Sequence, residues 1–199
     1  MSEVKGKTPD AKSEDGKIAV WESDNQRYFS VVKDEGQDVK LRFSMNASYF
    51  DAVKFTARDV VDMTEGNDVK FSDMPTKDQS KTYPVAFFIS GFTTEKKGEY
   101  TNHYARVEKA PLIMKEDRHI GYRLPVEGCD NPVSFMCRHK IGDDWYELTA
   151  RDCYLVAKDK EIQRGGFTFK FEGVEDHGNF TSAEVQVSRG SHESRSVSM

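Results

Sequence analysis

Short alternations of apolar and polar residues run through the chain from Trp21 onward. Val39, Leu41, Phe43 and Met45 alternate with polar residues, which is the period-two pattern of a strand with one buried face. The same period recurs at Val53 and Phe55, at Phe87 and Ile89 behind Pro84, at Val133, Phe135 and Cys137, at Phe167, Phe169 and Phe171, and at Val185 and Val187. No stretch keeps apolar residues at helical spacing over three turns. The pattern therefore predicts an all-β protein.

The first 20 residues have a different composition. They are rich in Lys, Asp, Glu, Ser and Gly and carry only isolated apolar residues. Such segments bury too little apolar surface to offset the entropy of ordering the chain. Residues 1–20 are therefore predicted to form a disordered N-terminal arm.

Internal similarity divides the remainder of the chain. Thr56–Asp59 reads Thr-Ala-Arg-Asp, and Thr149–Asp152 repeats it. Three further pairs follow the same order: Val39–Phe43 with Val133–Cys137, Glu35-Gly36 with Glu127-Gly128, and Gly98–Thr101 with Gly178–Thr181. A short match arises by chance, but ordered landmarks favour a duplicated unit. We expect two domains, at residues 21–116 and 117–199, with extra residues near 65–80 in the first copy.

At these landmarks the sequence resembles the immunoglobulin superfamily, in particular its intermediate-set domains. The sixth strand of that family carries Asp-x-Gly-x-Tyr-x-Cys. The corresponding residues here are Lys96, Gly98, Tyr100 and Asn102 in the first copy and Asp176, Gly178, Phe180 and Ser182 in the second. The resemblance implies two tandem immunoglobulin-like β-sandwiches. A single jelly roll spanning the chain is the alternative sandwich.

The resemblance also implies how each core is filled. Phe43 and Cys137 stand at the second-strand cysteine position, with Cys137 opposite Ser182, so neither copy holds the family's disulfide. The third-strand tryptophan corresponds to Phe55 in the first copy and to Trp145 or Leu148 in the second. Tyr100 corresponds to the family's tyrosine corner. The last strands are then expected at Pro111–Lys115 and Glu193–Met199.

Charge and cysteine content narrow the partners and the compartment. The 199 residues carry a net charge of −5 and no long basic stripe, which argues against nucleic acid and anionic membranes as partners. No apolar run is long enough to span a membrane, so no membrane insertion is expected. Three cysteines form no disulfide framework. We expect a cytoplasmic protein, or a secreted one if a signal peptide was removed.

No motif nominates a catalytic, cofactor-binding or metal-binding residue. Cys137, His139 and Cys153 suggest zinc, yet the Cys-x-His spacing has no second pair. The glycines of Arg164–Gly166 precede a strand rather than a helix, which indicates a hairpin turn and not a phosphate loop. No Ser or Cys has a His placed to activate it. The repeated Thr-Ala-Arg-Asp is interpreted as a strand end with a surface Arg–Asp pair.

These observations favour a non-enzymatic adaptor or structural protein that binds another protein and needs no cofactor. Binding through a sheet face or an edge strand is expected, with the strand near Pro84 and the final strand around Val197 as candidate edges. One alternative is a secreted or viral receptor-like module, which glycosylation at Asn46 and Asn179 would favour. Another is a β-sandwich that binds carbohydrate or lipid, which an exposed aromatic platform at Trp21 or Trp145 would favour.

Overall fold

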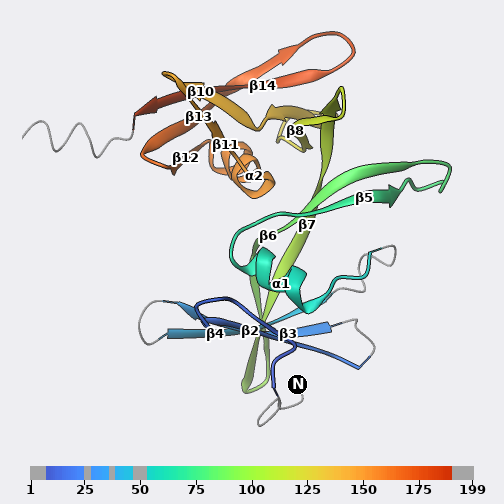
Figure 1. The fold of residues 1–199 in the computed structure, drawn as a ribbon, viewed down its shortest axis with the longest axis vertical. Coiled ribbons are helices and arrows are strands. Elements are labelled where there is room, and N and C mark those ends of the chain that lie inside the picture. The colour runs from blue at the N-terminus through green and yellow to red at the C-terminus, as the bar shows by residue number, and fades with distance from the viewer. Residues whose placement is uncertain (1–7, 25–27, 36–38, 47–52, 190–199) are drawn as a thin grey trace, which may run out of the picture. The chain divides into compact units, whose positions relative to one another are not determined.

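The computed structural model describes residues 8–24, 28–35, 39–46 and 53–189. It divides the chain into two compact units, Met1–Lys109 (unit 1) and Ala110–Met199 (unit 2), and the long strand β7 passes from one to the other (Figure 1). Strands make up 60% of the described residues, which also contain two short helices, so the prediction of a mainly β protein is confirmed. Tandem immunoglobulin-like sandwiches are not confirmed.

Unit 1 is built on one mixed sheet. Its elements are β1 (Ala11–Lys12), β2 (Ile18–Glu22), β3 (Tyr28–Glu35), β4 (Val39–Asn46), α1 (Ala57–Thr64), β5 (Val69–Pro75), β6 (Thr82–Lys97) and the first part of β7 (Tyr100–Lys115). The strand order is β1-β2-β3-β4-β7-β6-β5. At the centre, β4 and β7 run parallel, and Ser44 pairs with Tyr104.

Unit 2 is also built on one mixed sheet. Its elements are the second part of β7, β8 (Arg118–Leu124), β9 (Val133–Met136), β10 (Arg138–Ile141), β11 (Asp144–Glu147), α2 (Ala150–Asp159), β12 (Glu161–Arg164), β13 (Phe167–Asp176) and β14 (Thr181–Arg189). The strand order is β7-β8-β9-β14-β13-β12, and β10 and β11 form a separate hairpin. At the centre, β9 and β14 run parallel, and Ser134 pairs with Ser182.

The two units therefore have the same order of main elements. Apart from the two-residue strand β1, each has three sheet strands, a helix and three more sheet strands, and the third and sixth of these strands form the parallel pair. The matched segments Gly98–Thr101 and Gly178–Thr181 lie at the turns before β7 and β14. Unit 2 adds the β10–β11 hairpin between its third strand and its helix, where residues 53–56 of unit 1 form no strand.

The repeated Thr-Ala-Arg-Asp begins a helix in both units. The Thr56 hydroxyl accepts a bond from the Asp59 backbone N–H (3.2 Å), and the Asp59 carboxylate accepts one from the Thr56 N–H (2.9 Å). Thr149 and Asp152 make the same two bonds, at 3.0 and 3.1 Å. The predicted strand end is wrong because these side chains satisfy N–H groups left unpaired at a helix start. With 8 and 10 residues, the helices are too short to show three turns of apolar spacing.

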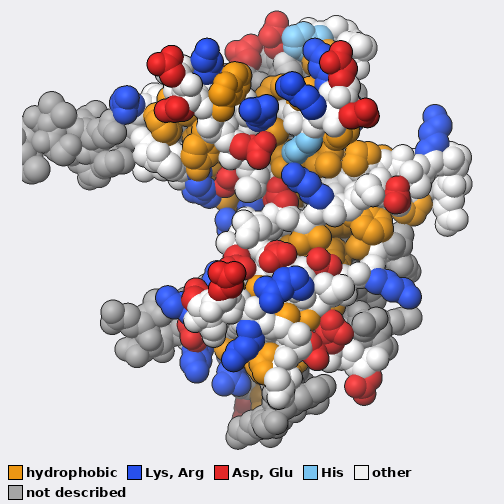
Figure 2. All heavy atoms as spheres, in the orientation of Figure 1, with side chains coloured by type: hydrophobic (Ala, Val, Ile, Leu, Met, Phe, Trp, Pro, Cys, Tyr) orange, Lys and Arg blue, Asp and Glu red, His pale blue; other side chains and the backbone are white. Residues whose placement is uncertain are grey.

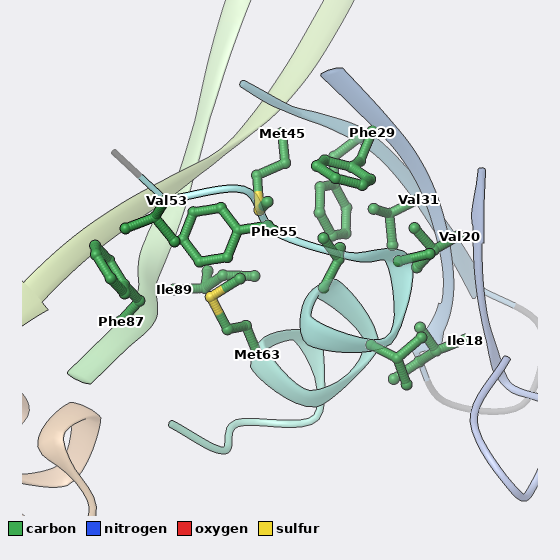
Figure 3. Packing of buried hydrophobic residues seen from close by; sticks show 14 of the residues in the cluster. Ile18, Val20, Phe29, Val31, Met45, Val53, Phe55, Met63, Phe87 and Ile89 are labelled. Carbon is green, nitrogen blue, oxygen red and sulfur yellow. The ribbon is translucent and has the colours of Figure 1, made fainter. Parts of the chain in front are cut away.

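The core of unit 1 lies between the sheet and α1 (Figure 3). Phe43 and Met45 of β4 are buried, which confirms the predicted strand. Val53 and Phe55 are buried as well, and the Phe55 ring meets the Phe87 ring edge-on at 5.1 Å. They lie in the segment before α1 and not in a strand, so that part of the prediction is wrong. Two-residue spacing marks any extended segment over a core, whether or not a neighbouring strand pairs with it.

The structure also corrects the prediction of a disordered N-terminal arm. Ile18 and Val20 of β2 are 6% and 0% exposed, so residues 8–20 belong to the fold and not to a disordered arm. A turn precedes β2. In this turn the Asp15 carboxylate accepts hydrogen bonds from the Ser13 hydroxyl (2.6 Å) and the Lys17 N–H (3.0 Å), and these bonds lower the pKa of Asp15. Two apolar residues suffice here because β2 pairs along its length with β3. Residues 1–7 lie outside the described residues.

Several residues compared with the immunoglobulin pattern lie elsewhere than expected. The tyrosine-corner prediction is wrong, because Tyr100 is 76% exposed at the β6–β7 turn. Trp145 is 58% exposed, whereas Leu148 is buried and fills the core position. Cys137 is a buried cysteine that forms no disulfide, and the residue that pairs with Ser182 is Ser134. Pro111–Lys115 is part of strand β7, but this part belongs to unit 2 and pairs with β8, so it is not the last strand of the first copy. Glu193–Met199 lies outside the described residues.

Candidate binding surfaces

The residues considered for zinc form part of the unit 2 core. Cys137 and Cys153 are buried thiols, and His139 donates from Nε2 to the Met136 carbonyl oxygen (3.0 Å). Burial lowers the pKa of His139, and its ring meets the Phe169 ring at 5.5 Å. Across the described parts of both units, no group of three or more His, Cys, Asp or Glu side chains is placed to hold a metal ion. The arrangement is that of a packed histidine.

A serine–histidine pair escaped the sequence analysis. His177 Nε2 lies 2.8 Å from the Ser182 hydroxyl oxygen, a contact that no sequence motif indicated. The Glu175 carboxylate lies 3.9 Å from the same Nε2 atom. A nucleophilic triad needs its carboxylate on the other ring nitrogen, where it fixes the tautomer and stabilises the charged ring. The geometry is that of a turn hydrogen bond, with the His177 ring stacked on Phe180 at 4.4 Å.

The sheet edges are poorly suited to accept a partner's strand. The strand near Pro84 is β6, which lies between β5 and β7, so that predicted edge is wrong. The edge strand β5 has a bulge between Phe71 and Met74 and ends at Pro75, and β12 has only four residues. Short, bulged and proline-bearing edges discourage strand addition. The other predicted edge, around Val197, lies outside the described residues. Sheet faces and hairpins are therefore the better candidates.

The β10–β11 hairpin of unit 2 presents a first candidate surface. Arg138 pairs with Glu147 and Lys140 with Trp145, so these four side chains share one side of the hairpin. They are exposed, and so is Met136 at 45%. The Arg138 guanidinium carbon lies 5.3 Å from the Trp145 ring centroid. We call Met136, Arg138, Lys140, Trp145 and Glu147 the hairpin face.

The other side of the hairpin is fixed to unit 2. The His139 and Tyr146 rings both contact the Phe169 ring, at 5.5 Å. The Leu148 N–H donates to the Cys137 carbonyl oxygen just beyond the strand pair (2.6 Å). The hairpin face is thus held by a buried layer beneath it. An exposed Trp on such a support loses little conformational entropy when a partner covers it.

The sheet of unit 1 presents a second candidate surface on the side opposite its core. Trp21 pairs with Ser30, Ser30 with Ser44, and Ser44 with Tyr104, which gives one row across β2, β3, β4 and β7. Tyr28, Arg42 and Arg106 lie two residues along the strands from this row and therefore point to the same side. Tyr28 is 50% exposed, both arginines are exposed, and Trp21 and Tyr104 are half-buried. We call Trp21, Tyr28, Arg42, Tyr104 and Arg106 the sheet face.

Sequence reasoning found part of these surfaces. Trp21 and Trp145 were singled out as possible aromatic platforms, whereas Met136, Arg42 and Arg106 were not. The available signal was strand parity, because Met136 and Arg42 lie next to buried residues such as Phe135 and Phe43, and Arg106 lies between two half-buried ones. What parity could not supply is the strand order that brings Trp21 and Tyr104 into one row. In Figure 2, hydrophobic side chains reach the surface beside Lys and Arg side chains in both units.

No family model, curated protein or solved structure matches this chain. Among the described residues, neither helix has the length or apolar character to cross a bilayer.

Proposed function

We propose that this chain is a non-enzymatic protein-binding protein whose partner docks on the hairpin face of unit 2. The observation that carries the proposal is Trp145, a large ring that is 58% exposed on a firmly supported hairpin. On that face the Arg138 guanidinium carbon lies 5.3 Å from the Trp145 ring centroid, and the exposed Met136 precedes Arg138 by two residues. Trp, Arg and Met are enriched where protein interfaces are fully buried, and Trp and Arg dominate their energetics.

The rest of the fold supports a binding role. Trp145 belongs to a hairpin that unit 1 shows no counterpart of in its described residues, while the common elements are used for packing. We propose that the two units are a tandem repeat that arose by duplication, since their strand orders coincide, and that the protein acts in the cytoplasm. A surface added to one copy of a repeat is a natural place for a partner-specific site. The resemblance to immunoglobulin domains stays a prediction.

The test compares two variants of the full chain as affinity baits. Trp145→Ala removes the ring from the hairpin face, and Trp21→Ala removes a ring of similar size from unit 1 as the matched control. Proteins from the native cell that bind the wild type and Trp21→Ala but not Trp145→Ala are the expected partners. With the purified partner, we expect Trp145→Ala to cost about 2–4 kcal/mol of binding free energy. Equal retention by both variants would rule out the hairpin face.

A second candidate function is carbohydrate binding on the same face. The exposed ring of Trp145 favours it, because an aromatic face is the platform that this alternative requires. A glycan array with wild type and Trp145→Ala separates the two functions. Glycan binding that depends on Trp145, without a Trp145-dependent protein partner, would replace protein binding as the function. The receptor-like alternative is tested separately, by glycosylation in a secretory host at Asn179, which is exposed beside the β13–β14 turn.

A further inference from the structure

We infer that the β10–β11 hairpin is a pH-sensitive element, which leaves its docked position on unit 2 when the His139 ring becomes charged. Release removes the support of the hairpin face, so acidification weakens partner binding there, and this consequence rests on the proposed function. The release itself lies within unit 2 and is measured without a partner. It follows from how the hairpin is attached and from where His139 lies.

Few contacts attach the hairpin to unit 2. β10 and β11 pair with each other in a two-stranded sheet that is separate from the main sheet. In residues 138–147 no side chain is fully buried, and His139, Ile141 and Tyr146 are half-buried. Local opening needs little free energy where buried apolar contacts are few and backbone hydrogen bonds are exposed. The docked position therefore depends on these three side chains, which we call the docking layer.

Two side chains of the docking layer meet on one buried ring. His139 and Tyr146 pair directly across the hairpin, and the centroid of each ring lies 5.5 Å from that of Phe169. The Tyr146 ring also lies against the Gly165 backbone, where a Cβ atom would be 2.6 Å from the ring. Within the docking layer, His139 is the residue that takes up a proton near neutral pH, because isoleucine does not titrate and tyrosine ionises only at high pH.

The docked position favours the neutral form of His139. Its Nε2 atom donates to the Met136 carbonyl oxygen (3.0 Å), so a further proton is added at Nδ1. Burial lowers the pKa of His139 and outweighs the bond to the Met136 carbonyl, which raises it. On a released hairpin the ring is surrounded by water, which solvates the charged form. Protonation therefore shifts the equilibrium from the docked to the released hairpin.

Charged side chains reach the docking layer from several elements. β9 carries no charged residue, and β13 presents phenylalanines on the side that faces the hairpin. The charged residues of β10 and the last residue of β11 point to the opposite side, on the hairpin face. The remaining charged groups come from β11, α2, the C-cap of α2, β12 and β14, and they are Asp144, Asp152, Lys160, Arg164 and Arg189.

This set gives a charged His139 no counter-ion. Asp152 accepts a bond from Arg164 Nε (2.8 Å), and Asp144 is exposed. The other two cations lie over phenylalanine rings of β13, at 4.6 and 6.0 Å from the ring centroids. Among the described residues no carboxylate forms an ion pair with His139, whose polar contact is the Met136 carbonyl. A proton on His139 therefore gains no compensating attraction for the water that it loses on docking.

Hydrogen exchange of the full chain at pH 7.5 and 5.5 tests the release, with rates corrected for the intrinsic effect of pH on exchange. We expect protection in residues 138–147 to fall by about 3- to 10-fold, the upper value being the limit for one proton and an ordinary histidine pKa of about 6.5. Amides of the β13–β14 pair should keep their protection, which shows that the rest of unit 2 stays folded.

Two variants of His139 remove the titration in different ways. His139→Gln keeps a side-chain N–H donor, and His139→Phe keeps a ring next to Phe169. The protection of the hairpin should be independent of pH in both variants, even if one of them docks less tightly than wild type. His177→Gln is the matched control, because it removes a histidine from the β13–β14 turn of the same unit and should behave as wild type. An unchanged hairpin in wild type, or an equal fall in wild type and both His139 variants, would overturn the inference.

Affinity capture at the two pH values then tests the consequence for binding. Wild type should retain less of any Trp145-dependent partner at pH 5.5, by a factor similar to the loss of protection, whereas His139→Phe should retain as much as at pH 7.5. Release of the hairpin without a change in capture would refute its regulatory role. If no partner depends on Trp145 at pH 7.5, the proposed function has failed, and hydrogen exchange still decides whether the hairpin is released.

Discussion

Units 1 and 2 share an order of elements but carry different surfaces. In both, a parallel pair of strands lies at the centre of the sheet and a capped helix joins the two halves. In unit 1, β3, β4 and β7 carry Ser30, Ser44 and Tyr104 in one row, whereas the corresponding strands β8, β9 and β14 of unit 2 carry Arg123, Ser134 and Ser182. Unit 2 instead exposes Trp145 on an added hairpin. The backbone pairing is common to both units, whereas the exposed side chains differ between them.

The N-termini of the two helices also share a backbone arrangement but differ in their side-chain contacts. Both units use a Thr–Asp capping box, but the two carboxylates have different surroundings. Asp152 is 8% exposed and accepts a further bond from the Arg164 side chain (Nε–Oδ1 2.8 Å). Asp59 is less buried, and in unit 1 it is Glu22 that reaches the helix, accepting a bond from the Ala57 N–H (2.9 Å). The same four-residue sequence therefore makes different side-chain contacts in the two units.

The largest expected effect concerns the separate cores. Phe43→Ala removes a ring that is 1% exposed in unit 1, and Phe169→Ala removes one that is 0% exposed in unit 2. Each should lower the free energy of unfolding by about 3–5 kcal/mol, because the lost contacts leave a cavity. Urea denaturation measures the loss, and hydrogen exchange locates it. If Phe43→Ala reduced amide protection in unit 2 as strongly as in unit 1, the description of two separate cores would be wrong.

The next effect distinguishes the two capping boxes. Asp152→Ala removes the cap bond and leaves the half-buried Arg164 guanidinium without that carboxylate, so we expect a loss of about 2–3 kcal/mol. Asp59→Ala removes the cap bond alone and should cost about 1 kcal/mol. Urea denaturation of both variants gives the comparison. Equal losses would show that Arg164 contributes nothing measurable, and Arg164→Ala in both backgrounds would check this directly.

The smallest effect is a pH dependence confined to unit 2. Burial lowers the pKa of His139 in the folded state, so below about 6.5 the unfolded chain binds a proton that the folded chain does not. Stability from this residue is therefore fully present above the unfolded pKa and is lost as the pH falls below it. Between pH 7.5 and 5.5, His139→Gln should lose less stability than wild type in urea denaturation. An identical decline in both proteins would show that His139 titrates normally.

The sequence predicted those parts of the fold that depend on local pattern. Val39–Met45 shows its buried face in its period, and Thr56–Asp59 and Thr149–Asp152 mark equivalent positions in the two units. The helices were missed because 8 and 10 residues give too few turns to show a period. β2 was missed because its two buried side chains depend on pairing with β3.

The candidate surfaces were less predictable for a related reason. Trp145 was compared with a core tryptophan because tryptophan side chains are usually buried. Its exposure depends on a hairpin whose other side packs on Phe169, and the sequence does not show that packing. The parallel pairing of β4 with β7 joins segments far apart in the chain, and no local pattern reports it. The row from Trp21 to Tyr104 exists only through that pairing. The sequence shows which residues are available to form a surface, but long-range strand pairing determines which of them lie side by side.

The role of the hairpin face is tested most directly by one binding measurement. Wild type, Trp21→Ala and Trp145→Ala are each titrated with the purified protein partner. We predict that Trp145→Ala weakens partner binding by about 2–4 kcal/mol and that Trp21→Ala binds as wild type does. Equal affinities of wild type and Trp145→Ala would contradict the account.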